Sequence, residues 1–225
     1  MITYHHEIEQ DSEEWKAIRL GLITASVVGE LITPSTLKVA DNQGSRGLLY
    51  DLAAQRVTGY VEPSYFNDDM LRGHDDEIEA RNLYSRHIAP VEKCGFITRE
   101  VGGLKFGYSP DGLVGVDGLI EVKSKNQKLH MRSVIEGEVP KDHIMQIQMG
   151  LFVSGREWCD YVGHCGGMAM VRYRVYLDEN IQDALLAALL SSEHKIQSII
   201  KKYQDMVEFN KFILTERKQS GDTII

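Results

Sequence analysis

Ser109-Pro110-Asp111-Gly112, followed nine residues later by Glu121-Val122-Lys123, is the most informative part of the sequence. Residues 119–123 alternate apolar and polar side chains with period two, which predicts a β-strand. In a strand, residues i and i+2 share a face, so Glu121 and Lys123 are expected to point the same way. The sequence therefore predicts a carboxylate and an ammonium group side by side on one strand.

A hairpin turn before this strand is expected to bring a second carboxylate to the same place. Residues 116–118, Val-Asp-Gly, contain the Asp-Gly turn signal, and residues 104–108 are expected to form the partner strand, which returns Asp111 toward Glu121 and Lys123. Two carboxylates and an ammonium can bind a divalent cation and activate a water against a phosphodiester. A solvated hairpin with an exposed ion pair worth about 0–1 kcal/mol fits the same residues, so the rest of the chain has to decide.

Composition and charge narrow the class of protein. The 225 residues are 43% hydrophobic and 26% charged, which is usual for a globular chain with one large domain. The net charge of −8 argues against a non-specific nucleic-acid coat, but it is compatible with an enzyme whose acids hold a metal. No apolar run approaches 18 residues and the N-terminus does not resemble a signal peptide, so we expect no membrane contact and a cytoplasmic location.

The cysteines do not indicate a disulfide framework or a metal site. There are three, Cys94, Cys159 and Cys165, and a reducing compartment fits them best. Cys159, His164 and Cys165 lack the Cys-x-x-Cys spacing of common zinc sites, so alternating strand positions explain them better.

The order of expected elements indicates an α/β sandwich. Asp11 and Glu14 have capping-box spacing for a first helix, and Thr24-Ala25-Ser26 can cap a short second one that ends near residue 32. The region 34–45 is expected to be a loop. The remaining helices are expected at 48–57, 68–88, 140–153 and 181–209, and the strands at 91–98, 104–108, 119–123, 161–165 and 169–177.

An acidic helix segment offers a third carboxylate. Glu77, Arg81 and Tyr84 follow helical i, i+4, i+7 spacing, whereas the acids at 75–79 also fit a solvated face. Spacing alone leaves Asp76 as a competitor for Glu77.

Two further clusters stand out. Gln148 falls inside the apolar stripe of the helix at 140–153, so it needs a specific partner, whether a ligand or a core group. Arg19 precedes Gly21 and an expected helix start. Together these could form a phosphate cradle, although an exposed arginine on a surface turn is favoured on local grounds.

Taken together, the clusters resemble the phage lambda exonuclease family, the viral recombination nucleases of the PD-(D/E)XK superfamily. The run at 19–26, Arg-Leu-Gly-x-Ile-Thr-Ala-Ser, is the most specific, because nuclease folds in general do not carry it. The matching stretches occur in the family's order at 15–26, 73–81, 109–112, 121–123 and 146–148.

The resemblance implies a fold and a set of site residues. The fold would be α/β, a restriction-endonuclease-like PD-(D/E)XK core with a central mixed sheet flanked by helices. One nuclease domain would span 1–225, with N-terminal helices at 11–58, a catalytic core at 68–177 and a C-terminal helix at 181–209. The catalytic residues would be Asp111, Glu121, Lys123, Glu77 and Gln148. Two Mg²⁺ ions, with Mn²⁺ as an alternative, would be held by Asp111, Glu121, Glu77 and the Val122 carbonyl. The 5′-phosphate end would be held by Arg19, Ser26 and Ser109.

The resemblance also implies an activity and partners. Members degrade one strand of double-stranded DNA from a 5′-phosphate end to mononucleotides, as ring-shaped homotrimers that work beside a single-strand annealing protein in phage recombination. A phage or prophage origin in a bacterial host follows. Met70, just before the acidic helix segment, is a candidate wedge between terminal base pairs. One departure is Ser124, where relatives often have a Cys-Pro pair.

Other functions remain open from the residues. The same core can belong to a structure-selective or restriction-type endonuclease, which would cut closed circular DNA. A DNA-binding or assembly module without catalysis is a second alternative, and a scaffold with solvated acidic clusters is a third. Lys123 could act as a base or as a charge stabiliser.

Overall fold

The computed structural model describes residues 1–62 and 68–217. Six α-helices and one 3₁₀ turn alternate with ten strands in the described part of the chain. The helical elements are α1 (Glu13–Arg19), η1 (Val28–Glu30), α2 (Gln43–Thr58), α3 (Asp68–His87), α4 (Gln127–Glu136), α5 (Lys141–Ser154) and α6 (Glu179–Asn210). The strands are β1 (Ile2–His5), β2 (Ile23–Thr24), β3 (Ile32–Thr33), β4 (Lys38–Val39), β5 (Phe96–Val101), β6 (Leu104–Tyr108), β7 (Gly112–Val114), β8 (Gly118–Ser124), β9 (Trp158–His164) and β10 (Val171–Tyr176).

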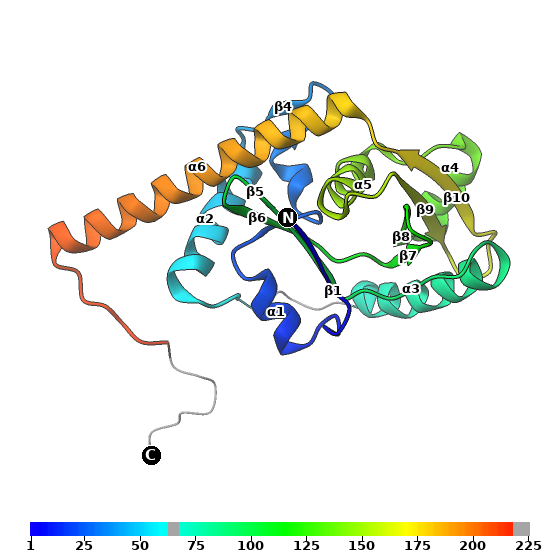
Figure 1. Cartoon of the computed structure of the whole chain (residues 1–225), viewed down its shortest axis with the longest axis horizontal. Coiled ribbons are helices and arrows are strands. Elements are labelled where there is room, and N and C mark those ends of the chain that lie inside the picture. The colour runs from blue at the N-terminus through cyan, green and yellow to red at the C-terminus, as the bar shows by residue number, and fades with distance from the viewer. Residues whose placement is uncertain (63–67, 218–225) are drawn as a thin grey trace, which may run out of the picture.

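The strands form two four-stranded sheets, in the orders β1-β5-β6-β2 and β10-β9-β8-β7, and β3 pairs with β4. Each large sheet is mixed. Strand β2 runs parallel to β6 and β8 runs parallel to β9, whereas the other neighbours are antiparallel. Helices flank these sheets, which confirms the expected α/β class (Figure 1).

The second sheet is covered by different helices on its two faces. Ile120 and Val122 of β8 pack with Ala80 and Tyr84 of α3. Leu119 of β8, together with Cys159 and Tyr161 of β9, belongs to the larger core that includes α5. Because side chains alternate along a strand, Glu121 and Lys123 face the α5 side, and Ser124 faces the α3 side.

The predicted partner of β8 was wrong. Residues 104–108 form β6, as expected, but β6 pairs with β5 and β2. The hairpin partner is the short strand β7, in which Gly112 is the register partner of Ile120. Three residues, 109–111, separate β6 from β7, so the chain passes from one sheet to the other at the Ser-Pro-Asp segment.

Two expectations near the N-terminus are corrected. Ser12, not Asp11, caps α1, because its side chain accepts a hydrogen bond from the Trp15 N–H. The second helix predicted up to residue 32 is reduced to the single turn η1, flanked by β2 and β3. Pairing of Ile23 and Thr24 with β6 takes this segment into the sheet.

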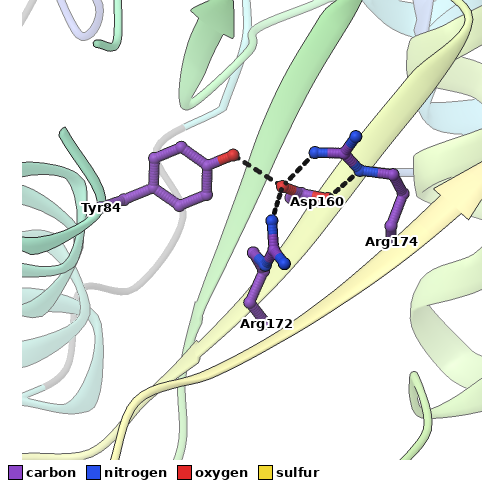
Figure 2. A network of polar contacts seen from close by, with 4 residues as sticks. All are labelled: Tyr84, Asp160, Arg172 and Arg174. Atoms are coloured by element: carbon purple, nitrogen blue, oxygen red, sulfur yellow. Dashed lines mark hydrogen bonds and ion pairs between the residues drawn. The ribbon is translucent and has the colours of Figure 1, made fainter. Parts of the chain in front are cut away.

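A buried polar network joins α3 to the second sheet (Figure 2). Asp160 of β9 is fully buried. It accepts hydrogen bonds from the Tyr84 hydroxyl at 2.6 Å and from Arg174 Nε and Nη2 at 2.8 and 2.9 Å, and Arg172 Nη1 lies 3.4 Å away. Burial alone would raise the pKa of Asp160, but these hydrogen bonds and charges hold the pKa below its usual value.

The long helix α6 packs through its N-terminal half and then extends beyond the other elements (Figure 1). Glu193 forms a two-pronged ion pair with Arg56 of α2, with both N···O distances at 2.7 Å. Beyond Ile196 the aromatic side chains of Tyr203 and Phe209 are exposed. No helix in the described residues is long and apolar enough to cross a membrane. Cys94, Cys159 and Cys165 are free thiols and all three are buried.

Candidate active site

Asp111 lies where the chain crosses between the two sheets. The Gln10 side chain donates to the Pro110 carbonyl oxygen at 3.0 Å, and Asp111 Oδ2 accepts the Val122 backbone N–H at 2.6 Å. The carboxylate is therefore tied to the middle of β8, beside Glu121 and Lys123. The convergence predicted from the sequence is present, although the connection runs through β7.

Glu121 and Lys123 lie on one face of β8, as their spacing predicts. The Lys123 ammonium is 2.8 Å from Glu121 Oε1, and the Glu121 side chain is 2% exposed. Glu121 also accepts a hydrogen bond from the Tyr108 hydroxyl at 3.1 Å and one from the Gln146 amide of α5. Three donors from different elements thus fix this carboxylate.

The position of Tyr108 depends on a glycine in α5. A Cβ at Gly150 would lie 2.8 Å from the Tyr108 ring, closer than side chains normally approach. Gly150 therefore lets the ring pack against the helix and present its hydroxyl to Glu121. Burial, and then the charge of Glu121, raise the pKa of Tyr108 well above its usual value, so this hydroxyl acts as a donor.

The two carboxylates of the cluster, Asp111 and Glu121, create an environment that favours a positive charge beside them. Burial, followed by the charges of Glu121 and Glu77, raises the pKa of Asp111 well above its usual value. Burial alone would lower the pKa of Lys123, but Glu121 and Asp111 outweigh it and the net shift is upward. The lysine is therefore charged, and it offsets part of the negative charge of the two acids.

Glu77 and Asp76, the two acids between which spacing left the choice open, have different surroundings. Glu77 is 23% exposed, pairs with Arg81 one turn away, and adds its charge to the environment of Asp111. Asp76 instead contacts Ser124 and His164. Glu77 is therefore the α3 carboxylate whose charge acts on Asp111, and its role as a metal ligand stays a prediction. Met70 lies in α3, but its side chain is outside the described part of the structure.

A cradle of donors lies beside Asp111. Arg19 Nη1 and Trp15 Nε1 both donate to the Ser109 hydroxyl oxygen, at 2.8 and 2.9 Å. The Arg19 guanidinium stacks 4.0 Å above the Trp15 ring, and burial lowers the pKa of Arg19 to about 10. The surface-turn interpretation favoured on local grounds was therefore wrong, and Arg19 and Ser109 lie together as the resemblance implied.

Ser26 is near this cradle in the fold but does not contact it. The preceding residue, Ala25, donates its N–H to the Gly107 carbonyl oxygen at 3.0 Å, which places Ser26 at the end of the β2–β6 pairing. Its side chain is exposed, and its hydroxyl lies 3.1 Å from Thr24 Oγ1.

Gln148 is not brought to the cluster. Its amide donates to the Tyr176 carbonyl oxygen at 2.8 Å, and its Oε1 accepts from the Asp178 N–H at 3.1 Å and from Gln182 at 2.9 Å. It is a satisfied core glutamine that joins α5 to the start of α6. Gln146, two positions earlier, occupies the position in the cluster that was expected for Gln148. Since each position turns the helix by about 100°, the two side chains point toward nearly opposite sides of it.

Sequence reasoning missed three residues that shape the site: Trp15, Tyr108 and Gln146. Trp15 was placed only at the start of the matched stretch 15–26, and Tyr108 only in the expected strand at 104–108. Gln146 lies within the matched segment 146–148, where spacing relative to Ile144 and Ile147 placed only Gln148 in the apolar stripe. The signal in the sequence was that Gln146 lies outside the apolar stripe, where a side chain can reach a site.

The donor set suits a hard divalent cation. The candidates are the carboxylates of Asp111, Glu121 and Glu77 and the Val122 carbonyl, all oxygen ligands of the kind that Mg²⁺ and Mn²⁺ take. In the described residues no three His, Cys, Asp or Glu side chains stand ready as a common ligand set. Lys123 and Arg81 instead pair with the carboxylates. Burial, followed by the charges of Glu121 and Glu77, raises the pKa of Asp111; a bound cation would offset those charges, so the oxygen donors fit a divalent metal.

Solved structures of exonucleases resemble the fold of this chain. A phage-related exonuclease from Haemophilus somnus 129PT is 11% identical, with a TM-score of 0.57, over 81% of this chain and 96% of its own. At that identity the likeness shows a shared fold alone. An alkaline exonuclease (LHK-Exo) from Laribacter hongkongensis is 30% identical, with a TM-score of 0.67, over 87% of this chain and 100% of its own. Its complex with dAMP is 31% identical over the same shares, with a TM-score of 0.68.

Residues 14–157 match the YqaJ-like viral recombinase domain. The chain belongs to that family. No curated protein is significantly similar to this YqaJ-like chain. The matched range contains the Arg19 cradle, Asp111, the β8 pair and Gln146, so the family assignment covers the whole cluster. The resemblance to lambda-type exonucleases agrees with it.

Proposed function

We propose that this YqaJ-like protein is a metal-dependent exonuclease that degrades one strand of double-stranded DNA from its 5′ end to mononucleotides. The observation that carries the proposal is the position of Asp111. It bonds to Val122 between the Glu121–Lys123 pair and the Arg19–Ser109 cradle. Exonuclease relatives, one of them in complex with dAMP, support the nuclease class and its product.

Asp111, Glu121, Glu77 and the Val122 carbonyl would hold two Mg²⁺ ions, with Mn²⁺ as an alternative. When bound, such ions lower the pKa of a water and stabilise charge on the leaving oxygen. The chain's own contribution is to hold Glu121 through Tyr108, Lys123 and Gln146, so that the carboxylate keeps one orientation.

Lys123 acts as a charge stabiliser in this proposal. Its ammonium lies 2.8 Å from Glu121 Oε1 and places a positive charge beside the carboxylates. Its 25% exposure lets it reach a phosphate from the edge of the site, where it can offset the negative charge that develops during hydrolysis.

The cradle supports the proposed preference for DNA ends. Arg19 is mostly buried, rests on Trp15 and shares the Ser109 hydroxyl with it. A guanidinium and hydroxyl arranged in this way suit a terminal 5′-phosphate. Ser26 would assist from the neighbouring β2–β6 end. A duplex with a 5′-phosphate is therefore the proposed substrate.

The test uses wild type and Lys123→Ala with Mg²⁺ and three DNAs: a 5′-phosphorylated linear duplex, a 5′-hydroxyl duplex and a closed circle. We expect wild type alone to release mononucleotides, fastest from the phosphorylated duplex, and EDTA to abolish release. Cutting of the circle would instead establish an endonuclease, and absence of any Lys123-dependent cleavage would establish a binding module.

Arg19→Ala tests the end-binding role. We expect it to remove most of the advantage of the 5′-phosphorylated duplex, by about 1.5–3 kcal/mol for a charged hydrogen bond, while slow release from the 5′-hydroxyl duplex persists. Arg46→Ala, in an exposed arginine of the first turn of α2 that pairs with Asp41, is the control. An unchanged preference for phosphorylated ends in Arg19→Ala would refute the assignment.

The remaining parts of the proposal concern assembly and setting. By its resemblance the chain would form a homotrimer, work beside a single-strand annealing protein, and act in the cytoplasm of a bacterial host. The chain would be a single nuclease domain over 1–225, with the catalytic core at 68–177.

A further inference from the structure

The α3-facing side of β8 carries polar contacts that the site itself does not use. Asp76 precedes Glu77 on α3, and Ser124 follows Lys123 on β8. The Ser124 hydroxyl is hydrogen-bonded to Asp76 Oδ2. This hydrogen bond therefore joins Asp76, which is next to Glu77, to Ser124, which is next to Lys123.

His164 of β9 closes this contact from the next strand. It is the register partner of Ser124 in the parallel β8–β9 pairing and is 4% exposed, and its Nδ1 lies 3.6 Å from Asp76 Oδ1. That Nδ1 is buried and has no hydrogen-bond partner within the described residues. Asp76 is thus held between two neighbouring strands and is 17% exposed.

Apolar contacts and the Tyr84–Asp160 hydrogen bond hold α3 on the sheet about two turns beyond Asp76. Ala80 and Tyr84 pack on Ile120, Val122 and Val162, and such packing is non-directional. A hydrogen bond is directional, because it weakens steeply when donor and acceptor are misaligned. Since consecutive helical residues differ by about 100°, fixing Asp76 on the sheet also fixes the direction of Glu77.

We propose that Asp76, Ser124 and His164 form a positioning clamp that sets Glu77 toward Asp111 and thereby tunes the affinity of the site for divalent metal. The inference rests on the proposed function, since it assumes that Glu77 and Asp111 share the metal site. In this proposal none of the three residues touches the substrate or the metal, and each acts through Glu77.

The test compares Ser124→Ala, Ser124→Thr and, as matched control, Ser133→Ala. Ser133 is a buried serine of α4 whose hydroxyl donates within its own helix to the Leu129 carbonyl oxygen. Mononucleotide release is measured against Mg²⁺ concentration and against DNA concentration, and Mn²⁺ binding is measured by calorimetry on the full chain. Outer-sphere partners of metal ligands typically tune affinity by 10–100-fold.

We expect Ser124→Ala to raise the half-saturating Mg²⁺ concentration and the Mn²⁺ dissociation constant about tenfold, with KM for DNA unchanged. Ser124→Thr, which keeps a hydroxyl, should restore both values, and Ser133→Ala should match wild type. Equal metal affinities in Ser124→Ala and Ser133→Ala would overturn the clamp while leaving the nuclease intact.

Asp76→Asn separates the clamp from direct ligation. The amide keeps an oxygen that can accept from Ser124, so we expect a loss of Mn²⁺ affinity no larger than in Ser124→Ala. A much larger loss would make Asp76 a ligand and overturn the clamp. Wild type that binds Mn²⁺ without releasing nucleotides would refute the nuclease function instead, and the calorimetric comparison would still decide the clamp.

Discussion

Two glutamines two positions apart on α5 show how far single residues can be assigned. Gln146 donates to Glu121 in the site, and Gln148 is bonded on both sides of its amide at the β10–α6 junction. A helical pattern shows which one is more buried, but it does not show which core the buried one enters. Asp111, Glu121 and Lys123 were found from sequence because a two-residue period and a turn constrain where they point.

The two glutamines give a paired prediction. Gln146→Ala removes a hydrogen bond to a carboxylate, so we expect kcat to fall about tenfold, equivalent to about 1.4 kcal/mol, with stability nearly unchanged. Gln148→Ala removes the side-chain partner of the Tyr176 carbonyl and the Asp178 N–H, which are part-buried bonds, and should lower the free energy of unfolding by about 1–3 kcal/mol. Nuclease rates and urea unfolding of both variants provide the measurement. A larger kcat loss in a well-folded Gln148→Ala would reverse the assignment.

His143 gives a prediction about pH. It stacks on Tyr161 at 5.6 Å, and burial lowers its pKa to about 4. The unfolded chain, with a His pKa near 6.5, then binds the extra proton between about pH 6.5 and 4, so stability should fall as pH falls through that window. His143→Phe keeps the stacking and should lessen the loss between pH 7.5 and 5 by about 1–2 kcal/mol. Urea unfolding at both pH values tests it, with exposed His194→Phe as control. Equal losses in wild type and His143→Phe would contradict the prediction.

At the scale of elements, the docking of α3 depends on buried charge. Tyr84 and Asp160 are both fully buried, and two arginines from the edge strand β10 balance the carboxylate (Figure 2). Arg174 also stacks 3.5 Å above the Trp158 ring. Removing the Tyr84 hydroxyl should lower the free energy of unfolding far less than removing the negative charge of Asp160.

We therefore expect Tyr84→Phe to lower the free energy of unfolding by about 1 kcal/mol, since Arg174 still pairs with Asp160. Asp160→Asn should cost about 3 kcal/mol. It leaves two arginines without their counter-charge, and the effect is reduced because both partly face solvent. Urea unfolding with unchanged slope measures both, and Tyr203→Phe on the exposed part of α6 is the control. Similar costs for Tyr84→Phe and Asp160→Asn would contradict this account.

The longer elements were predictable and the short ones were not. Residues 104–108 form β6 as expected, and α5 and α6 fall close to the predicted 140–153 and 181–209. Strand β7 has three residues, too few for a period to appear, and α4 was missed, although Asn126 caps its start and Gly137 its end. The two-residue strand β2 forms because β6 provides its hydrogen bonds, which no local pattern records.

At the scale of the whole molecule, the predicted class was confirmed, but the division of strands into two sheets was not foreseen. Register and sheet membership depend on long-range pairing, such as that of β1 with β5. The site lies where the chain crosses between the two sheets. Its first half, the acid and lysine of β8 with Asp111, was predicted from the Asp-Gly turn and the period of the strand. Its second half, the Arg19 cradle, was one of two interpretations of the residues, and only the resemblance favoured it.

The proposed homotrimer makes a prediction about mass. Light scattering after size exclusion should give three times the chain mass of 25.5 kDa at micromolar concentration, because a ring closes only with the full set of subunits. Degradation of a long duplex by such a ring should continue after dilution into competitor DNA. A mass equal to a single chain, with release that stops on dilution, would exclude the ring.

The burial of every cysteine has a practical consequence. Cys94, Cys159 and Cys165 are inside the protein, and burial raises the pKa of the Cys94 and Cys159 thiols, which lowers their reactivity. A cysteine introduced in place of Val116, a side chain 85% exposed in the β7–β8 turn, should therefore take a maleimide dye selectively. Single-molecule fluorescence could then follow the labelled protein along DNA while its native thiols remain in place.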